Sequence, residues 1–287
     1  MPADQTHQQA RRRPWWTSRW LLVGTAAGVA AIVGIMLVVG LVRSSPSQSH
    51  PAGAAGNVAP AAVVDPATHP NVAVLAGLGT AGATDPFTAL ASTTPAMTLN
   101  GHPLVAYVGA DFCPFCASRR WSVVVALSRF GTFTNLGLAT SSSTDVHPNT
   151  NSFSFHGSTF TSAYVSFSGV ETETTDRQAL DTPSTQVATA LAQFDGPPLT
   201  TQVGSIPFLD IGNRFISIGG GFSPGLLQGM SWQQIAGVIR DPNNQVGRSI
   251  MTDANIITAA ICSATGGQPS SVCAAAPVPG IVATLPR

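Results

Sequence analysis

The longest apolar segment of the chain lies close to its N-terminus. Residues 20–42 carry no charge and form an apolar run of about the 20 residues that a helix needs to span a bilayer core. Four arginines precede this run and Arg43 follows it, which by the positive-inside rule keeps the N-terminus in the cytoplasm. The pattern predicts a single-pass transmembrane anchor over 20–42, behind a cytoplasmic tail over 1–19.

A cleaved signal peptide is the alternative interpretation of this run. The apolar region of a signal peptide has about 7–15 residues and precedes a small-residue cleavage site. The run here is longer, and the Ala-Gly-Ala sequence at 52–54 is a weak cleavage candidate. An uncleaved anchor is therefore the prediction, and everything after it is expected outside the cytoplasm.

Beyond the anchor, the chain divides by composition. Residues 43–70 are rich in Ser, Ala, Pro and Gly with no periodic apolar face, as is typical of a tether. Residues 71–273 are numerous enough for one well-buried domain. The Pro/Ala-rich residues 274–287 are predicted to be a disordered tail.

Within 71–273, apolar periodicity predicts alternating strands and helices. The expected strands cover 103–109, 136–140, 206–211 and 214–218, with a Gly212-Asn213 turn between the last two. The expected helices cover 113–130, closed by Gly131, then 184–194, and 231–240 and 253–263 with Ser231 and Asp253 as N-caps. Residues 152–170 alternate aromatic with small polar residues and predict an inserted β-ribbon. This order indicates an α/β domain.

Charge changes the picture in two ways. Only 9% of the residues are charged and the net charge is +0, which excludes a strongly basic nucleic-acid binder for the chain as a whole. The first 43 residues hold five arginines and one aspartate, so the anchor region has a net charge of +4 and the remainder −4. The predicted exported domain is therefore mildly acidic, and no nucleic-acid partner is expected.

Candidate chemistry lies directly after the strand at 103–109. Cys113-Pro114-Phe115-Cys116 is a Cys-x-x-Cys sequence at the start of a predicted helix. The unsatisfied N–H groups and positive dipole end of a helix N-terminus favour a thiolate. Cys113 is predicted to be the attacking sulfur, and Cys116, one turn deeper, to resolve the mixed disulfide. Pro114 suits the first helical turn, where its missing N–H is not needed.

Arg119 and Arg120 lie a turn or more beyond the motif. We expect them to form a solvated face of the helix, without a part in activating the thiol.

Two other interpretations of the motif stay open, a structural disulfide and half of a zinc site. Zinc would need two further ligands, but Cys262 and Cys273 are spaced far wider than the usual pair. His147 and His156 are not spaced as ligands and are expected at the surface or in turns. We therefore predict neither a bound metal nor a cofactor.

A second feature, the sequence Ser205-Ile206-Pro207-Phe208, supports the redox interpretation. A proline at the head of an apolar strand cannot donate to the sheet from its own nitrogen. The sequences GADFCPFCASRRWSVVVALSRFG and SIPFLDIGNRF together resemble the thioredoxin superfamily. More closely, they resemble the thioredoxin-like family known as domain of unknown function 929, over about 71–273.

This resemblance implies an α/β, thioredoxin-like fold, a mixed sheet with flanking helices and here an inserted β-ribbon. It implies a cis-Pro207 packed against the Cys-x-x-Cys, with the neighbouring backbone pairing with a substrate peptide. Pro207 then joins the two cysteines as a catalytic residue, and Ile206, Pro114 and Phe115 line the substrate groove. The family adds no substrate.

Cys262 and Cys273 form a second pair near the C-terminus. In an oxidising compartment a structural disulfide is the expected pairing. A second redox pair that exchanges with Cys113–Cys116 predicts the same connectivity, so the sequence does not separate the two roles.

The leading hypothesis is a membrane-anchored thiol–disulfide oxidoreductase that acts on the thiols and disulfides of exported proteins. The Pro-Phe dipeptide and the compartment favour an oxidase or isomerase over a reductase, with a membrane redox partner that the sequence does not identify. The alternatives are a non-catalytic thioredoxin-fold binding module, which would use its groove or the aromatic ribbon, and a metal-binding envelope domain.

Overall fold

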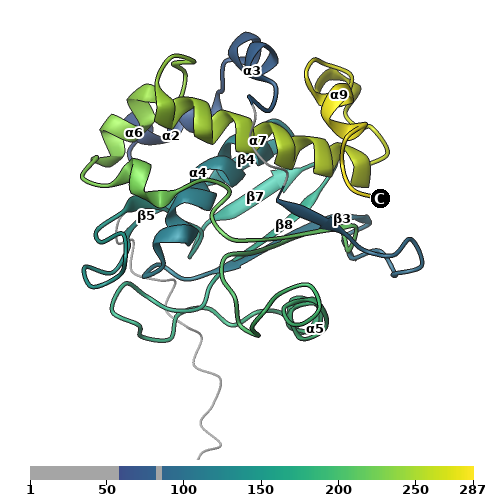
Figure 1. The fold of residues 1–287 in the computed structure, drawn as a ribbon, viewed down its shortest axis with the longest axis horizontal. Helices are drawn as coiled ribbons and strands as arrows, with labels where there is room; N and C mark the ends of the chain where they lie inside the picture. The colour runs from purple at the N-terminus through teal and green to yellow at the C-terminus, as the bar shows by residue number, and fades with distance from the viewer. Residues whose placement is uncertain (1–57, 82–85) are drawn as a thin grey trace, which may run out of the picture. The chain divides into compact units, whose positions relative to one another are not determined.

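A computed structural model of the chain describes residues 58–81 and 86–287 (Figure 1). The predicted tail over 1–19, the anchor over 20–42 and most of the tether lie outside the described residues. Among the helices that are described, none combines the length and the apolar character needed to cross a bilayer.

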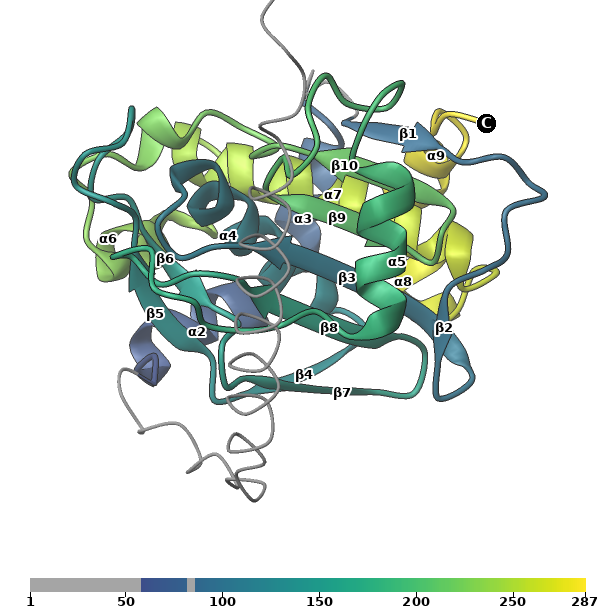
Figure 2. The same ribbon diagram turned by 90° about the horizontal axis from the view of Figure 1, so that it is seen from below.

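A mixed sheet of six strands forms the centre of the domain (Figure 2). From one edge inward, its strands are β1 (Phe87–Ala89), β10 (Phe215–Ile218), β9 (Phe208–Ile211) and β3 (His102–Gly109), with β2 (Thr98–Leu99) and β8 (Ser166–Glu171) both beside β3. Strand β8 is parallel to β3, and β9 is antiparallel to it. The described domain is therefore α/β with a mixed sheet, as predicted.

Helices cover both faces of this sheet. Two of them, α4 (Pro114–Leu127) and α7 (Gln245–Ala264), lie on one face, and α5 (Thr185–Phe194) lies on the other (Figure 1). Along β3, Val105 and Tyr107 pack with the core residues of α4 and α7, whereas Leu104 and Val108 pack with those of α5. Because successive side chains alternate between faces, a strand buried on both sides reads as one continuous apolar run.

The predicted hairpin joins β9 to β10. Gly212 and Asn213 have φ values of 64° and 54°. Positive φ at both central residues is the geometry of a type I′ turn, which favours Asn and Gly. The prediction of this hairpin is confirmed.

Helix α7 is longer than predicted and begins elsewhere. Its N-cap is Asn244, whose side chain accepts hydrogen bonds from the Val246 and Gly247 amides. Asp253 was predicted to be an N-cap, but it lies buried in the middle of α7, where Arg119 balances its charge. Ser231 does cap α6 (Trp232–Val238), with a complete capping box.

The predicted ribbon exists, but its pairing differs from the prediction. Four strands follow α4, namely β4 (Gly131–Thr134), β5 (Gly137–Thr140), β6 (Asn151–Ser154) and β7 (Thr159–Ser162). Strand β5 pairs with β6, and β4 pairs with β7. Residues 152–170 therefore do not pair with themselves, and their last part supplies β8 of the central sheet. Gly131 begins β4, because α4 already ends at Leu127.

The aromatic side chains of the inserted strands point into the domain. The Phe133 ring lies 6.0 Å from the Phe155 ring, 4.8 Å from Phe160 and 5.6 Å from Phe167. Phe153 and Phe155 are fully or almost fully buried. The phenylalanines of this alternating pattern therefore mark a buried layer, whereas Tyr164 is exposed.

Both ends of the described domain contain helices that the sequence did not predict. They are α2 (Ala61–Thr68), α3 (Val72–Leu78), α8 (Ser270–Cys273) and α9 (Val278–Val282), and a 3-10 turn, η2 (Pro224–Leu227), precedes α6. Helix α2 buries Val63 and Ala67, so the tether does not extend to residue 70. The predicted disordered tail instead buries Val278, Ile281 and Leu285, whose spacing gives one apolar helical face.

Candidate active site

The Cys-x-x-Cys sequence occupies the start of α4, as predicted. Cys113 is the N-cap, with extended backbone angles, and Pro114 takes the first helical position. The Cys116 amide donates a hydrogen bond to the Cys113 sulfur at 3.3 Å. A helix N-terminus therefore points at this sulfur with an N–H group that would otherwise lack a partner.

The two cysteines are both free thiols and differ in burial. Cys113 is 6% exposed, whereas Cys116 has no exposure and lies deeper in the domain. Phe115, between them, is 39% exposed, and its ring lies 6.0 Å from the His147 ring. Any partner that reaches the dithiol therefore meets the Cys113 sulfur and the Phe115 side chain first.

Hydrogen bonding and charge separate the acidities of the two thiols. The pKa of Cys113 is lowered, chiefly because the Cys116 side chain donates a hydrogen bond to its sulfur, while burial opposes this effect. The Cys116 amide and the Arg120 charge lower it further. Burial, followed by its hydrogen bond to Cys113, raises the pKa of Cys116 well above its usual range. The outer thiol is thus the better nucleophile and the better leaving group.

Arg120 lies buried beneath the dithiol, so the prediction of a solvated face is wrong. Its Nε and Nη2 form a two-point pair with the Glu171 carboxylate at 2.8 and 2.7 Å. Nη2 also donates to the Ala110 carbonyl at 2.6 Å and lies 3.5 Å from Asp111 Oδ1. Burial raises the pKa of Glu171 to about 7, against the lowering effect of Arg120.

The prediction that this arginine plays no part in activation also fails, because its charge contributes to the low pKa of Cys113. Tyr107 of β3 belongs to the same buried group. Its pKa is raised well above the usual range, first by burial, and Arg120 partly offsets this rise.

Arg119 is also fully buried. Its Nη1 pairs with Asp253 Oδ1 of α7 at 2.7 Å. Its Nε donates to the Gly219 carbonyl at 3.0 Å, and its Nη2 donates to Ser217 Oγ at 2.8 Å. No local pattern indicates this burial, since the partners lie 98–134 residues further along the chain.

The loop before β9 brings Pro207 to the dithiol. The Ile206–Pro207 peptide bond is cis, as the resemblance implied. The Cys113 sulfur lies 4.0 Å from the Ile206 carbonyl oxygen. Three parts of the chain therefore meet at Cys113, namely the end of β3, the start of α4 and the loop that leads into β9.

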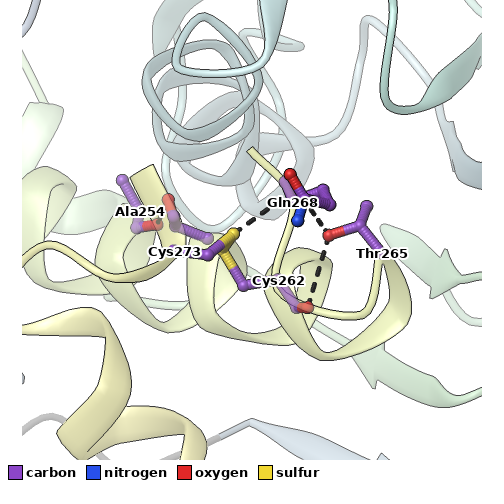
Figure 3. The surroundings of a disulfide bond; sticks show 6 residues. Ala254, Cys262, Thr265, Gln268 and Cys273 are labelled. Atoms are coloured by element: carbon purple, nitrogen blue, oxygen red, sulfur yellow. Dashed lines mark hydrogen bonds between the residues drawn. A yellow bond between two sulfur atoms is a disulfide. The ribbon is translucent and has the colours of Figure 1, made fainter. Parts of the chain in front are cut away.

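The second cysteine pair forms a disulfide at the far end of α7 (Figure 3). Cys262 and Cys273 are 2% and 8% exposed and belong to the main apolar core. Cys262 follows Asp253, the residue that contacts Arg119, by nine positions, or about 14 Å along the helix axis. This placement favours a structural role over exchange with Cys113 and Cys116.

His147 and His156, the two histidines weighed as zinc ligands, have different surroundings. His156 is exposed and pairs with Asp181 at 2.7 Å, and His147 lies in a turn beside Phe115. Within 58–81 and 86–287, no three His, Cys, Asp or Glu side chains come together as they would around a metal ion.

The fold and the site together define the class of protein. It is a mixed α/β protein in which a buried Cys-x-x-Cys lies at the start of a central helix. Residues 90–198 match the model of a family described as Domain of unknown function (DUF929). The match confirms the resemblance to domain of unknown function 929, over a shorter range than 71–273. It includes both cysteines of the motif and ends before Pro207. No curated protein and no solved structure is similar enough to the chain to match it.

Proposed function

We propose that this protein is a thioredoxin-like thiol–disulfide oxidoreductase whose reactive group is the Cys113–Cys116 dithiol. One observation carries the proposal. The Cys113 sulfur caps α4, has a lowered pKa and lies beside the Ile206 carbonyl. A stabilised thiolate above a more basic, deeper thiol is the arrangement that two-step disulfide exchange requires.

The topology supports the thioredoxin-like assignment. The chain runs through β3, α4, β8, α5, β9, β10 and α7, and the sheet order around the site is β8-β3-β9-β10. Pro207 directly precedes β9 and is cis. The mixed sheet with flanking helices and the cis-Pro207 are features that the resemblance implied. The inserted strands β4 to β7 lengthen the connection between α4 and β8.

The reductive direction of exchange uses both sulfurs. The Cys113 thiolate attacks one sulfur of a substrate disulfide, the substrate S–S bond breaks, and the other substrate sulfur leaves as a thiolate. Cys116 then loses its proton and attacks the Cys113 sulfur. The mixed disulfide breaks, the substrate leaves as a dithiol, and the protein retains a Cys113–Cys116 disulfide. Two electrons have passed from the protein to the substrate.

The oxidative direction reverses these steps. A substrate thiolate attacks Cys113 in the Cys113–Cys116 disulfide, and Cys116 leaves and takes up a proton. A second substrate thiolate then displaces Cys113. Because a thiolate of low pKa leaves faster, the lowered pKa of Cys113 supports release of an oxidised substrate. We therefore favour an oxidase or isomerase over a reductase.

Location and partners follow from the sequence. The anchor over 20–42 and the charge distribution support a single-pass membrane protein with this domain outside the cytoplasm. Its substrates are then exported proteins with cysteines. As an oxidase it needs a partner whose disulfide reoxidises Cys113 and Cys116, and the membrane is the natural place for that partner.

A non-catalytic binding module is the second candidate, and the low exposure of Cys113, 6%, favours it. Such a module would keep a fold of this kind with unreactive cysteines. The inward-facing rings of Phe133 and Phe155 leave it without the aromatic ribbon as a binding surface.

Exchange with a peptide that contains two cysteines separates the two candidates. The full chain, oxidised and kept in detergent, is mixed with the reduced peptide, and peptide disulfide is followed by mass spectrometry. We expect one peptide disulfide per chain and none with Cys113→Ser. When reduced Cys116→Ser is mixed instead with the oxidised peptide, Cys113 breaks the peptide disulfide and a mixed disulfide is trapped, because no second thiol of the protein can resolve it. Equal rates for the wild type and Cys113→Ser would exclude the oxidoreductase.

A further inference from the structure

Arg119 connects α4 to the loop that follows β10. Each of its three guanidinium nitrogens donates a hydrogen bond to a different residue: Nη1 to Asp253, Nε to Gly219 and Nη2 to Ser217. The side chains of the Arg119–Asp253 pair are 1% and 4% exposed. A planar guanidinium can serve three partners in fixed directions, which a lysine ammonium on a flexible stem does not reproduce.

The loop at 219–221 is packed against α4 and α7, and at Gly220 and Gly221 it leaves no room for a side chain. Ser118 Oγ donates to the Gly220 carbonyl at 3.1 Å, next to the carbonyl that Arg119 binds. A Cβ atom on Gly220 would lie 2.5 Å from Ser118 Oγ. A Cβ atom on Gly221, where φ is +74°, would lie 2.2 Å from Asp253 Oδ2. Two successive residues of α4 thus hold two successive carbonyls of a loop that requires glycine.

This loop in turn holds the backbone beside Cys113. The Gly219 amide donates to the Pro207 carbonyl at 3.0 Å. The preceding carbonyl, that of Ile206, is the one that lies 4.0 Å from the Cys113 sulfur. A continuous series of contacts therefore leads from Asp253 through Arg119, Gly219 and Pro207. It ends at the Ile206 carbonyl, which lies beside the Cys113 sulfur.

We propose that Arg119 is a positioning residue that fixes the backbone of Ile206 and Pro207 relative to the Cys113 sulfur, so that a disulfide-containing peptide is held in line for exchange. This inference rests on the proposed function, since it concerns the same exchange reaction. It assigns the two neighbouring arginines different roles. Arg120 contributes to the lowered pKa of Cys113, whereas Arg119 is not among the main causes of that shift.

The test compares a large with a small reagent. Peptide disulfide exchange requires the aligned backbone, whereas iodoacetamide requires only the thiolate. The variant Arg119→Met with Asp253→Asn leaves no buried charge without a partner. We expect its peptide exchange to fall by about tenfold or more, because small misplacements at a reacting centre cost this much. Its iodoacetamide rate and the pH at which that rate is half-maximal stay as in the wild type.

Two further variants complete the design, all in the full chain. Arg119→Lys keeps the charge opposite Asp253 but loses the planar guanidinium that binds three partners. We expect its rate of peptide exchange to lie between those of the wild type and the double variant. Arg248→Met, at an exposed arginine of α7, is the matched control and keeps the wild-type rate. Thermal unfolding followed by circular dichroism selects the folded variants, and Arg119→Lys carries the test if the double variant does not fold.

The outcomes are distinct. A wild-type chain that does not exchange with the peptide contradicts the proposed function. A wild type that exchanges, with Arg119 variants that exchange equally fast, contradicts the positioning role. Peptide and iodoacetamide rates that fall together also contradict it, because Arg119 would then act on the thiol itself.

Discussion

The two cysteine pairs show how one residue type acquires two chemistries. Cys113 and Cys116 lie at a helix N-terminus above an arginine–glutamate pair, with hydrogen bonds and charge acting on the sulfurs. Cys262 and Cys273 are joined in a disulfide within the apolar core. Burial alone does not distinguish the pairs, because Cys113 is as buried as Cys273.

The difference lies in the polar groups around each pair. An N–H group and a positive charge stabilise a thiolate at Cys113, and no such stabilisation is needed for a disulfide that stays closed. The comparison also explains why the spacing of the cysteines in the sequence predicts the surroundings of one pair and not of the other. A Cys-x-x-Cys after a buried strand specifies a helix N-terminus, whereas two cysteines 11 residues apart near the C-terminus specify only that they can meet.

The largest difference between the two cysteine pairs is expected in their effect on the rate of peptide exchange. Removing the Cys113 sulfur by Cys113→Ser should reduce peptide exchange to the uncatalysed rate, because a hydroxyl cannot replace a thiolate as nucleophile. The matched variant, Cys262→Ser with Cys273→Ser, should keep the wild-type rate. Loss of exchange in a folded form of that double variant would show that the second pair takes part in the reaction.

The free energy of unfolding should depend on the other pair, Cys262 and Cys273, more than on Cys113. The Cys262–Cys273 disulfide fixes α8 to α7, and in the chain-entropy model closing a loop of this length contributes about 2–4 kcal/mol to the free energy of unfolding. Cys262→Ser with Cys273→Ser should lose that amount in urea denaturation, while Cys113→Ser loses less than about 1 kcal/mol. Equal losses would contradict the division into a structural and a reactive pair.

Stability should also depend on pH through a buried carboxyl away from both pairs. Burial raises the pKa of Asp210 from its usual value near 4 to about 7. The folded state thus favours the protonated form, so this stabilisation is complete at pH values below about 4 and is lost as the pH rises through 7. We expect the free energy of unfolding to fall by roughly 2–4 kcal/mol between pH 4 and 8 from this group.

Asp210→Asn should flatten this part of the stability profile, measured by urea denaturation at several pH values. The pH dependence of Cys113 alkylation should not change in the same variant. A shift in the alkylation profile would show that the two titrations are linked.

The smallest effect concerns the hydrogen bond between the sulfurs. Because the Cys116 side chain is the largest cause of the lowered pKa at Cys113, Cys116→Ala should raise that pKa and slow alkylation near pH 7 several-fold, by about twofold to fivefold. Cys116→Ser keeps a donor and should lie closer to the wild type. Identical profiles for the two variants would exclude this hydrogen bond as the cause.

Local signals made the centre of the site predictable from the sequence. The apolar run of β3, the proline at the first turn of α4 and the Gly212-Asn213 turn are each determined by a few neighbouring residues. The same holds for the position of Pro207 ahead of β9. These features predicted Cys113 at a helix N-terminus, whereas the packing of Pro207 against the motif was implied by the family resemblance.

Long-range pairing accounts for what the sequence did not reveal. In the sequence, Arg119 and Arg120 look like surface residues. The acidic residues that pair with them in the structure, Asp253 and Glu171, lie 134 and 51 residues away along the chain. Strand β8 pairs in parallel with β3 across the whole insert, and no local pattern specifies that partner. Asp253 resembles an N-cap for the same reason, because its charge is balanced by tertiary structure and not by its own helix.

The most direct test of the account is the redox equilibrium of Cys113 and Cys116 in the full chain, measured against glutathione buffers by alkylation and mass spectrometry. The account predicts reversible two-electron interconversion, with a potential above that of thioredoxin, about −270 mV, and within the range of about −120 to −180 mV found for oxidases and isomerases. The Cys262–Cys273 disulfide should stay closed throughout. A Cys113–Cys116 pair that does not interconvert with the buffers would contradict the central claim and leave a non-catalytic module.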